Sequence, residues 1–531
     1  MSASSNPRSR LVLALLPALW FGACTDKSEG RISGVDPTNF LRFREVHEAA
    51  GISFTHDAHF QRSPTQPVAG GVACADYDGD GYLDLYVIGG DSSGNLLYRN
   101  KRDGTFEELS ARAGVQLLGG AWSGSTFVDL NGDGHLDLFL CGIDGTAPCI
   151  LLNKGDGTFA DATPGSGLDK VSTNSYCVAF GDIDGDGDLD MFLSQWKVDR
   201  GDGHNTQHLW RNDGKAVFTD ISDASGVAMA FSGGNAYTDT TFTPNFVDVD
   251  NDGDLDLVIA ADLGKNRVLI NDGRGNFTNI TPSDVLSDHA TGAAIGDYDN
   301  DGNLDWFVSG LSGPGLSGNH LYRNPGDGMF VDVTQAAGVS QGGWGWAASF
   351  ADLDNDGWLD LVQVNGFGTS PTSAYSQYLT DPTRLFMNNR NGTFTEKSAA
   401  LQLDDVNRGR GLVCFDFDRD GDLDLFVVNN LGKPSLWRND GGNIQNYLTV
   451  ALRYKGGNVQ GIGARIAVTA NGTTQIRELR SGCNYVSQNP AEAHFGLAAA
   501  AVVDSLVVTW PDRTQTTLTN VRSRQHLVVQ Y

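Results

Sequence analysis

Seven copies of one acidic loop constrain the fold of this chain more than any other feature of its sequence. The pattern D-x-[DN]-x-D-G-x-x-D begins at positions 76, 129, 182, 248, 297, 352 and 416. Each copy leads into an apolar strand such as "LDLYVIGG", and in most copies a turn with Gly beside Asn or Asp follows between two further strands. A unit therefore predicts four short strands, and the repetition predicts an all-β fold, a seven-bladed β-propeller over residues 42–440.

The outermost strand of each unit indicates how the ring closes. Six units end in a segment that begins with phenylalanine, namely Phe106, Phe159, Phe218, Phe277, Phe330 and Phe394. The seventh unit lacks this segment, whereas "FREVHEAAGISF", from Phe43, precedes the first loop. An open ring would leave unpaired sheet edges. We therefore expect the N-terminal strand to complete the seventh blade.

The acidic loop has the donor pattern of an oxygen-ligated cation site. Positions 1, 3, 5 and 9 offer side-chain oxygens, position 7 offers its carbonyl, and Gly at position 6 permits a sharp turn, as in a shortened EF-hand loop. All-oxygen ligation suits Ca²⁺ better than Zn²⁺ or Mg²⁺. In the second loop an asparagine replaces one aspartate. The predicted ligands, loop by loop, are Asp76, Asp78, Asp80, Tyr82 and Asp84; Asp129, Asn131, Asp133, His135 and Asp137; Asp182, Asp184, Asp186, Asp188 and Asp190; Asp248, Asp250, Asp252, Asp254 and Asp256; Asp297, Asp299, Asp301, Asn303 and Asp305; Asp352, Asp354, Asp356, Trp358 and Asp360; and Asp416, Asp418, Asp420, Asp422 and Asp424.

Electrostatics favours metal binding over the alternative, acidic turns without an ion. Two carboxylates 4–5 Å apart repel by roughly 3–4 kcal/mol at an effective dielectric near 20. Extracellular sites bind Ca²⁺ with Kd of about 10⁻⁴–10⁻³ M, so about 1 mM calcium would stabilise the fold by roughly 0.4–1.4 kcal/mol per site. About seven Ca²⁺ ions would cancel half of the net charge of −28, which itself excludes nucleic acid as a partner. We predict Ca²⁺ as a structural cofactor.

The N-terminal residues have the pattern of an export signal. Residues 1–24 carry two arginines, an apolar run, and "FGAC", which resembles a lipobox ending at Cys24. Three alternatives stay open: a lipoprotein attached through Cys24, a secreted protein, or a retained N-terminal anchor. All three place the mature chain outside the cytoplasm, in the outer membrane, in the periplasm or secreted. Residues 25–41 then form a polar tether, and the only membrane contact expected is the lipid anchor.

Six further cysteines do not form a dense disulfide framework. Cys74, Cys177 and Cys414 are each expected to be small buried side chains. Cys141 and Cys149 are close enough in sequence to bridge a hairpin, so a disulfide between them stays open.

Residues 446–531 form a separate unit by their pattern. Short runs such as "ARIAVTA" and "SLVVTW" alternate apolar and polar residues between Gly and Asn-Gly turns. This predicts a small β-sandwich-like domain. The unit has no metal or nucleophile motif, and His494 in "AHFGL" is expected to be a hydrogen-bonded structural residue.

The two parts together resemble a known family. The acidic loops resemble the FG-GAP or VCBS-type repeats of integrin-α-like propellers, and "GIGARI", "HFGL" and "VTWPD" resemble the ASPIC/UnbV domain. The combination is similar to the cartilage acidic protein family, and the N-terminus suggests a bacterial lipoprotein member. The resemblance implies calcium binding and an extracellular setting, and it fixes no reaction.

The strand that enters each acidic loop should line the central channel, and its side chains differ between blades. Residues six and eight before the first aspartate share one face of that strand. Aromatic and basic side chains at one channel mouth could bind a carboxylated or sugar-like ligand, although packing along the axis is the alternative. The candidate ligand-binding residues are Asn174, Tyr176, His289, Trp344, Trp346, Arg408 and Arg410.

No catalytic motif is visible, so no catalytic residue is assigned. The sequence favours a calcium-stabilised extracytoplasmic binding, adhesion or scaffold protein that recognises a glycan, a matrix component or a protein. An alternative is an enzyme, such as a calcium-assisted lyase or cyclase, with its site at the channel mouth. A structural role in a multiprotein envelope complex is the third possibility.

Overall fold

The computed structural model describes residues 40–57, 68–90, 94–168, 174–196, 208–230, 239–285, 289–368, 375–482 and 484–531. The predicted signal peptide with Cys24, most of the tether, and Cys483 lie outside these ranges. Helices in the described ranges are single turns: α1 (Ser110–Ala113), α2 (Val227–Ala230), α3 (Thr334–Ala337), η4 (Ser376–Tyr378) and η5 (Gly442–Ile444). Among the described residues, none of the helices has the length and apolar character needed to cross a bilayer.

Seven antiparallel sheets, here called blades 1 to 7, each hold one acidic loop between their first two strands. Blade 1 contains β2 (Val72–Ala75), β3 (Asp84–Val87), β4 (Leu96–Asn100) and β5 (Phe106–Glu108). Blades 2 and 3 contain β6 (Trp122–Val128), β7 (Asp137–Gly142), β8 (Cys149–Asn153) and β9 (Phe159–Asp161), then β10 (Ser175–Gly181), β11 (Asp190–Gln195), β12 (Leu209–Asn212) and β13 (Phe218–Asp220). Blade 4 contains β14 (Thr241–Val247), β15 (Asp256–Ala261), β16 (Arg267–Asn271) and β17 (Phe277–Asn279).

The remaining blades follow the same order, with one excursion. Blade 5 contains β18 (Ala293–Gly296), β19 (Asp305–Val308), β22 (His320–Arg323) and β23 (Val331–Asp332), and β20 (Ser312–Gly313) pairs with β21 (Leu316–Ser317) between them. Blade 6 contains β24 (Gly345–Ala351), β25 (Asp360–Asn365), β26 (Arg384–Asn388) and β27 (Phe394–Glu396). Blade 7 contains β28 (Gly409–Phe415), β29 (Asp424–Asn429), β30 (Ser435–Asp440) and β1 (Arg42–Glu45). The prediction of an all-β propeller is therefore confirmed.

The ring closes through the N-terminal strand, as the sequence predicted. β1 pairs antiparallel with β30, and Phe43, which is buried, lies opposite Asn439. The strand is shorter than the predicted segment, because the chain turns after Glu45. Backbone N–H groups of Ala50 and Ile52 donate to the carbonyls of Val46 and His47, which is a helical type of turn.

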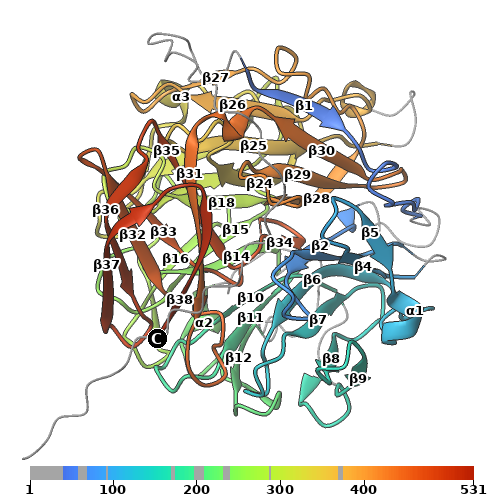
Figure 1. Cartoon of the computed structure of the whole chain (residues 1–531). Coiled ribbons are helices and arrows are strands. Elements are labelled where there is room, and N and C mark those ends of the chain that lie inside the picture. The colour runs from blue at the N-terminus through green and yellow to red at the C-terminus, as the bar shows by residue number, and fades with distance from the viewer. Residues whose placement is uncertain are drawn as a thin grey trace, which may run out of the picture.

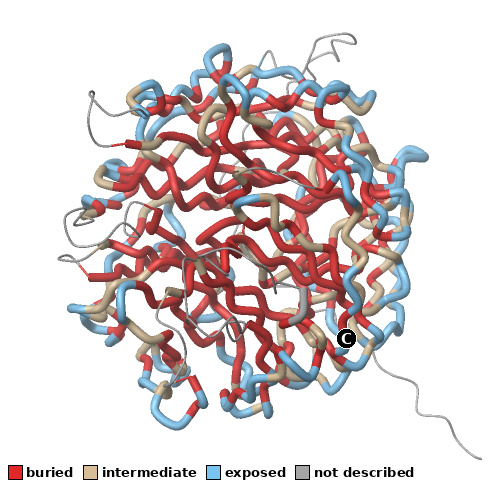
Figure 2. The backbone as a smooth tube through the Cα atoms, turned by 180° about the vertical axis from the view of Figure 1, so that it is seen from behind, coloured by how far each residue is buried: buried red, intermediate tan, exposed pale blue. Residues whose placement is uncertain are grey.

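The apolar core is distributed between neighbouring blades. In one cluster, Val72 and Leu85 of blade 1 pack with Val413 and Phe426 of blade 7. The first strands of the blades are buried and contact one another around an inner ring, for example β2 with β6 and with β28. Figure 2 shows this buried interior and the exposed rim of loops. Each blade therefore depends on its neighbours for burial of its apolar faces.

The C-terminal residues form two facing sheets, as predicted. One sheet has the order β35-β31-β38 and the other β33-β32-β36-β37. Phe495, Trp510 and Val508 lie in the core between them. The strands are β31 (Asn446–Arg453), β32 (Arg465–Ala470), β33 (Thr473–Glu478), β35 (Glu492–Ala498), β36 (Val502–Thr509), β37 (Gln515–Arg522) and β38 (Gln525–Gln530).

A segment of this C-terminal domain enters the propeller, which the sequence did not predict. This plug segment, residues 484–490, includes β34 (Ser487–Gln488), which pairs in parallel with β2. Figure 1 shows β34 in the middle of the inner ring of strands. Tyr485 is fully buried, its ring packs against Phe242 and Trp346, and its hydroxyl donates to the carbonyl of Val68. The C-terminal domain is therefore joined to the propeller through its axis.

Polar contacts outside the plug place the domain on the acidic-loop face of the ring. Arg419 of blade 7 forms a two-pronged ion pair with Glu492, at 2.8 and 2.9 Å. His494 lies 2.6 Å from the Asn355 side chain of blade 6 and 3.1 Å from the Thr449 hydroxyl. His494 is thus a hydrogen-bonded structural residue, and burial lowers its pKa to about 3.

Cys141 and Cys149 are buried thiols and do not form a disulfide. The pairing of β7 with β8 explains this, because Cys149 lies opposite Leu140. Neighbouring residues on a strand point to opposite faces, so Cys141 enters the core shared with blade 3 and Cys149 the core shared with blade 1.

Candidate metal sites

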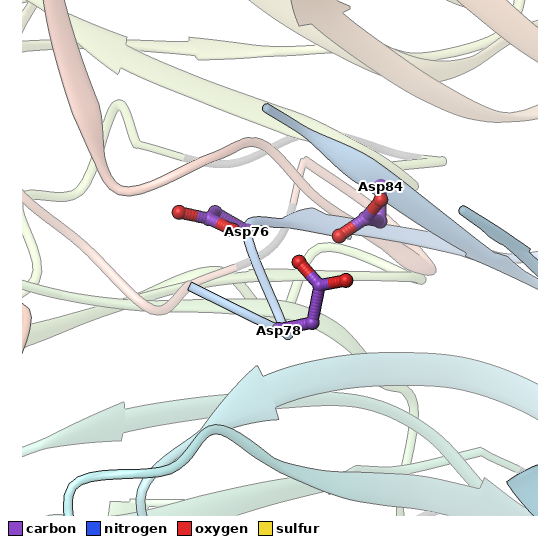
Figure 3. Close-up of side chains that lie close together, drawn as sticks. All are labelled: Asp76, Asp78 and Asp84. Carbon is purple, nitrogen blue, oxygen red and sulfur yellow. The ribbon is translucent and has the colours of Figure 1, made fainter. Parts of the chain in front are cut away.

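Carboxylates converge in the acidic loops. In the first loop, one oxygen each of Asp76, Asp78 and Asp84 lies within 4.8 Å of the others. Figure 3 shows these side chains gathered at the turn between β2 and β3, with the carboxylates of Asp78 and Asp84 turned toward each other. Positions 1, 3 and 9 converge in the same way in the third, fourth and fifth loops, and positions 1, 3 and 5 in the sixth. The repeat thus builds the same oxygen cluster several times.

Backbone hydrogen bonds hold each cluster in shape. In the first loop the Asp76 carboxylate accepts from the N–H groups of Asp80 and Gly81, at 2.8 and 3.0 Å. Gly81 has φ of +90°, a backbone conformation that glycine adopts without strain. The second carboxylate oxygen of Asp84 accepts from the Tyr77 N–H at 3.2 Å. The turn is therefore formed by the loop itself, and these hydrogen bonds fix the positions of the Asp76 and Asp84 carboxylates.

Burial makes these carboxylates costly to ionise without a cation. Burial, together with the charge of neighbouring aspartates, raises the pKa of Asp137 to about 7 and that of Asp190 and Asp256 to about 8, although backbone hydrogen bonds to these carboxylates oppose the shift. For Asp84 and Asp305 the pKa is raised well above its ordinary value for the same reasons. A bound divalent cation would favour the ionised form in each loop.

Within the described part of the chain, several buried carboxylate oxygens have no hydrogen-bond partner, which fits a cation. They include one oxygen each of Asp184, Asp248 and Asp418, which occupy positions 3, 1 and 3 of their loops. A buried carboxylate oxygen without a hydrogen bond is costly, and an oxygen-ligated divalent ion would supply the missing interaction. The donors are all oxygen, so the residues present fit Ca²⁺.

Arginines compensate part of the charge, which the sequence reasoning missed. Arg99 in β4 donates to Asp78 at 2.6 Å and to Asp80 at 3.1 Å. Arg323 in β22 makes the same pair of contacts with Asp299 and Asp301, at 3.0 and 2.8 Å. The predicted ligand Asp80 therefore has a second role as an ion-pair partner. Arg102 also pairs with Asp80, at 3.0 Å, but two arginines cannot balance the four aspartates of the first loop, so a net negative charge stays there.

Two of the predicted ligand positions make different contacts from the rest. In the second loop, the Asn131 amide nitrogen donates to Asp133 at 3.1 Å. At position 7 the backbone N–H donates to the carboxylate at position 5, as from Tyr82 to Asp80 at 3.0 Å. The position 7 carbonyls stay predicted ligands.

Seven asparagines, six of them buried and Asn388 half-buried, link the acidic loops into a closed cycle. Each asparagine lies at the end of the third strand of its blade or one residue from it, and its backbone N–H donates to the position 9 aspartate at 2.8–2.9 Å. Its side-chain nitrogen donates to the position 2 carbonyl of the preceding blade. The donors are Asn100, Asn153, Asn212, Asn271, Asn324, Asn388 and Asn439, and the acceptors, in the same order, are Phe417, Tyr77, Leu130, Ile183, Val249, Tyr298 and Leu353.

These asparagines are positioning residues for the loops. Blade 1 bonds to blade 7, and each later blade bonds to the one before it, so the cycle includes every acidic loop. The signal was present in the sequence, because "YRN", "LLN", "WRN" and "LIN" recur before each turn. From the sequence, this recurring asparagine is interpreted only as part of the turn.

The predicted channel residues divide into two groups. Tyr176, Trp346 and Arg410 are buried, and the Arg410 guanidinium carbon lies 3.9 Å from the Trp346 ring centre. Arg410 donates to the carbonyls of Gly366 and Gly409. These three residues therefore pack along the axis around Tyr485 and its neighbours, as the packing alternative expects.

The other group lies nearer the surface. Trp344 is half-buried, with its ring centre 4.0 Å from that of Phe367. His289 lies 3.2 Å from an Asp262 carboxylate oxygen, and the Asn174 side chain accepts from the Asp144 N–H. Arg408 is half-buried, and burial lowers its pKa.

Comparison with known proteins agrees with this architecture. The family described as "FG-GAP-like repeat" matches residues 76–140, 129–193, 248–308, 310–362 and 374–427, and "ASPIC and UnbV" matches residues 454–531. Cartilage acidic protein 1 of Mus musculus is 23% identical over 96% of this chain and 79% of its own length, and that of Homo sapiens is 25% identical over 73% and 68%.

The solved structures to which the chain is similar include two lectins. A lectin of Agrocybe aegerita, whose structure is described as recognising non-reducing terminal N-acetylglucosamine, covers 70% of this chain and 94% of its own, with 18% identity and a TM-score of 0.41. The BP39L lectin of Burkholderia pseudomallei covers 71% and 98%, with 13% identity and a TM-score of 0.45.

Proposed function

The chain belongs to the FG-GAP-like repeat family and carries an ASPIC and UnbV domain, and on that basis we propose that it is a calcium-stabilised extracytoplasmic binding protein. The relatives named cartilage acidic protein 1 and the FG-GAP repeats support an extracellular setting. The N-terminal export pattern supports the same compartment, with Cys24 as the lipid acceptor. Replacement of Cys24 by serine, followed by membrane fractionation, tests the anchor: the lipoprotein proposal expects release of the chain.

Calcium has a structural role in this proposal. The acidic loops hold buried carboxylates, and neighbouring arginines such as Arg99, Arg102 and Arg323 balance their charge only in part. The asparagine cycle couples each loop to its neighbour, so an ion that orders one loop also supports the next blade. Binding of a partner would then require calcium indirectly, through the shape of the ring.

The observation that carries a binding role is an aromatic cluster at the end of the channel away from the acidic loops. Trp344 precedes β24, whereas the acidic loop follows that strand. Its ring stacks on Phe367 and meets Tyr375 and Tyr378 edge-on, at 5.0 and 5.3 Å between centres. Tyr375 is 47% exposed. The exposed Tyr375 and the half-buried Trp344 lie near Arg408, whose backbone is beside Gly366, and such a group suits a sugar ring that carries hydroxyl or carboxylate groups.

We therefore propose a glycan as the ligand of this aromatic cluster. A glycan array with the calcium-loaded, purified chain should identify a binder, and titration should follow. Trp344→Ala is expected to weaken binding at least tenfold, because it removes the central ring of the cluster. Phe40→Ala is the control, since Phe40 is also about half exposed and belongs to the edge of blade 7. Equal loss in both variants, or no loss in Trp344→Ala, contradicts the proposal.

One observation favours the enzyme alternative enough to test it. His289 is 40% exposed and lies 3.2 Å from Asp262, so the two could exchange a proton with a bound substrate. If a lyase or cyclase acts at the channel mouth, the identified glycan should be converted by wild-type protein and not by His289→Ala. Binding without conversion by either protein supports the binding role.

A further inference from the structure

A cavity of about 150 Å³ lies between the propeller and the C-terminal domain. Its propeller wall includes Asn245 of β14, residues 293–296 of β18 and Ser349 of β24. Its opposite wall includes Glu478, Arg480 and Asn484, which come from the C-terminal domain and the plug segment. Asp352 and Asp416, the first residues of two acidic loops, form part of its edge. The aromatic cluster and the carboxylate clusters of the other loops do not contribute the polar side chains of this wall.

Three buried polar atoms of residues in the wall have no hydrogen-bond partner among the residues that the structure describes. They are the side-chain nitrogen of Asn245, one carboxylate oxygen of Glu478 and the side-chain oxygen of Asn484. These residues are 4%, 8% and 7% exposed. Leaving a buried polar atom unsatisfied costs about 1–3 kcal/mol, so three at one cavity indicate a missing partner.

The arginine in the wall has unused donors. Arg480 makes one hydrogen bond in the described part of the chain, to the carbonyl of Ile295 at 2.9 Å, although a guanidinium has five N–H groups. Burial lowers the pKa of Arg480 to about 10, and the Glu478 charge opposes that shift. Arg480 nevertheless keeps part of its surface exposed, because it lines the cavity.

The charges of Arg480 and Glu478 indicate how a ligand is oriented in the cavity. The other carboxylate oxygen of Glu478 pairs with Arg465 at 3.4 Å, so Glu478 does not saturate Arg480. Arg480 and the Asn245 amide nitrogen therefore donate to an anion. The free oxygens of Glu478 and Asn484 accept from a donor on the same molecule.

We propose that this cavity binds a small organic carboxylate that also carries a hydroxyl or ammonium group. A cavity of about 150 Å³ holds a molecule of the size of benzene, which is about six heavy atoms. A three-carbon hydroxy acid satisfies both requirements: its carboxylate faces Arg480 and Asn245, and its hydroxyl donates to Glu478 or Asn484. The site contains residues of both domains, so its ligand would strengthen the docking of the C-terminal domain on the propeller. It is separate from the glycan site and independent of it.

The experiment uses the calcium-loaded full chain, dialysed free of organic acids and titrated with sodium lactate by calorimetry. Sodium acetate and 1,2-propanediol serve as matched probes, because one lacks the hydroxyl and the other the carboxylate. Lactate is expected to bind at least tenfold more tightly than either. Equal affinity for acetate and lactate would contradict the roles of Glu478 and Asn484.

Two variants and a control locate the binding. Arg480→Met removes the charge at similar length, and Asn245→Leu removes the amide at similar volume; each is expected to weaken lactate binding at least tenfold. Arg522→Met, at an exposed arginine of β37, should leave it unchanged. A crystal structure with lactate gives the second measurement, which does not depend on how the variants fold. Water alone in the cavity at saturating lactate overturns the proposal.

Discussion

The asparagine cycle allows a sharp prediction for Asn271. Its side chain donates to the carbonyls of Ile183 and Leu255, at 2.8 and 3.1 Å, and accepts from the N–H groups of Gly273 and Gly275. Asn271→Ala removes all four hydrogen bonds and leaves two buried carbonyls without this donor. At about 1 kcal/mol per bond, we expect a loss of about 4 kcal/mol in the free energy of unfolding.

Thermal unfolding in calcium measures this loss. The unfolding entropy is about 2.1 cal/mol/K per residue, so a propeller of about 400 residues that unfolds as one unit should lose about 5 °C in Tm. Asn276→Ala is the matched control, because Asn276 lies in the same hairpin and is exposed, with its side chain bonded to Asp272. That variant should stay within about 1 °C of wild type, since exposed bonds contribute little.

A second readout separates the cycle from simple packing. Asn271 contacts position 2 of the third loop and, through its backbone, position 9 of the fourth. The Tm difference between wild type and Asn271→Ala should therefore depend on calcium. If Asn271→Ala has the same Tm as wild type, or if Asn271→Ala and Asn276→Ala lose equally in Tm, the reasoning is refuted.

Three further outcomes are expected. Excess chelator should lower Tm by about 4–12 °C, the equivalent of roughly 3–10 kcal/mol over all sites, and added calcium should restore it; a melt unchanged by chelator contradicts a structural role for calcium. Tyr485→Ala should lower the free energy of unfolding by about 3–5 kcal/mol because it empties the axis, whereas Tyr485→Phe should lower it by about 1 kcal/mol for the lost hydrogen bond to Val68. Denaturant unfolding measures both values, and equal losses would argue against a packed plug. His208 is buried, which lowers its pKa, but its contacts with Asp239 and the Leu193 carbonyl outweigh burial and raise the pKa above 6.5. The contribution of His208 to the free energy of unfolding is therefore fully present below pH 6.5 and is lost as the pH rises through the pKa of the folded state. His208→Gln should destabilise the protein more at pH 6 than at pH 9. The reverse order would contradict a raised pKa for His208.

The repeat made the fold predictable to a large extent. The period of the acidic loops, the Phe-led outer strands and the missing seventh outer strand depend on local sequence, and β1 pairs with β30 as expected. The convergence of Asp76, Asp78 and Asp84 also follows from local spacing. Local patterns are visible in one sequence because turn chemistry and strand alternation act over a few residues.

Contacts between distant segments were not predictable in this way. The plug segment lies about 400 positions from β2, and its "NYVSQNP" sequence has no alternation that would indicate a strand. The predicted channel ligands Trp346 and Arg410 proved to be buried against each other, because the axis had to be filled. The cavity at Arg480 exists only where two domains meet, so no property of either sequence segment alone could show it.

The most direct test of calcium in the loops is a crystal structure grown in about 5 mM calcium, a concentration above the expected Kd. Anomalous difference density locates calcium without assuming its ligands. The account predicts a peak between the position 1, 3 and 9 carboxylates of the acidic loops, including the cluster of Asp76, Asp78 and Asp84. Loops that keep this shape with no anomalous peak at any cluster would contradict it.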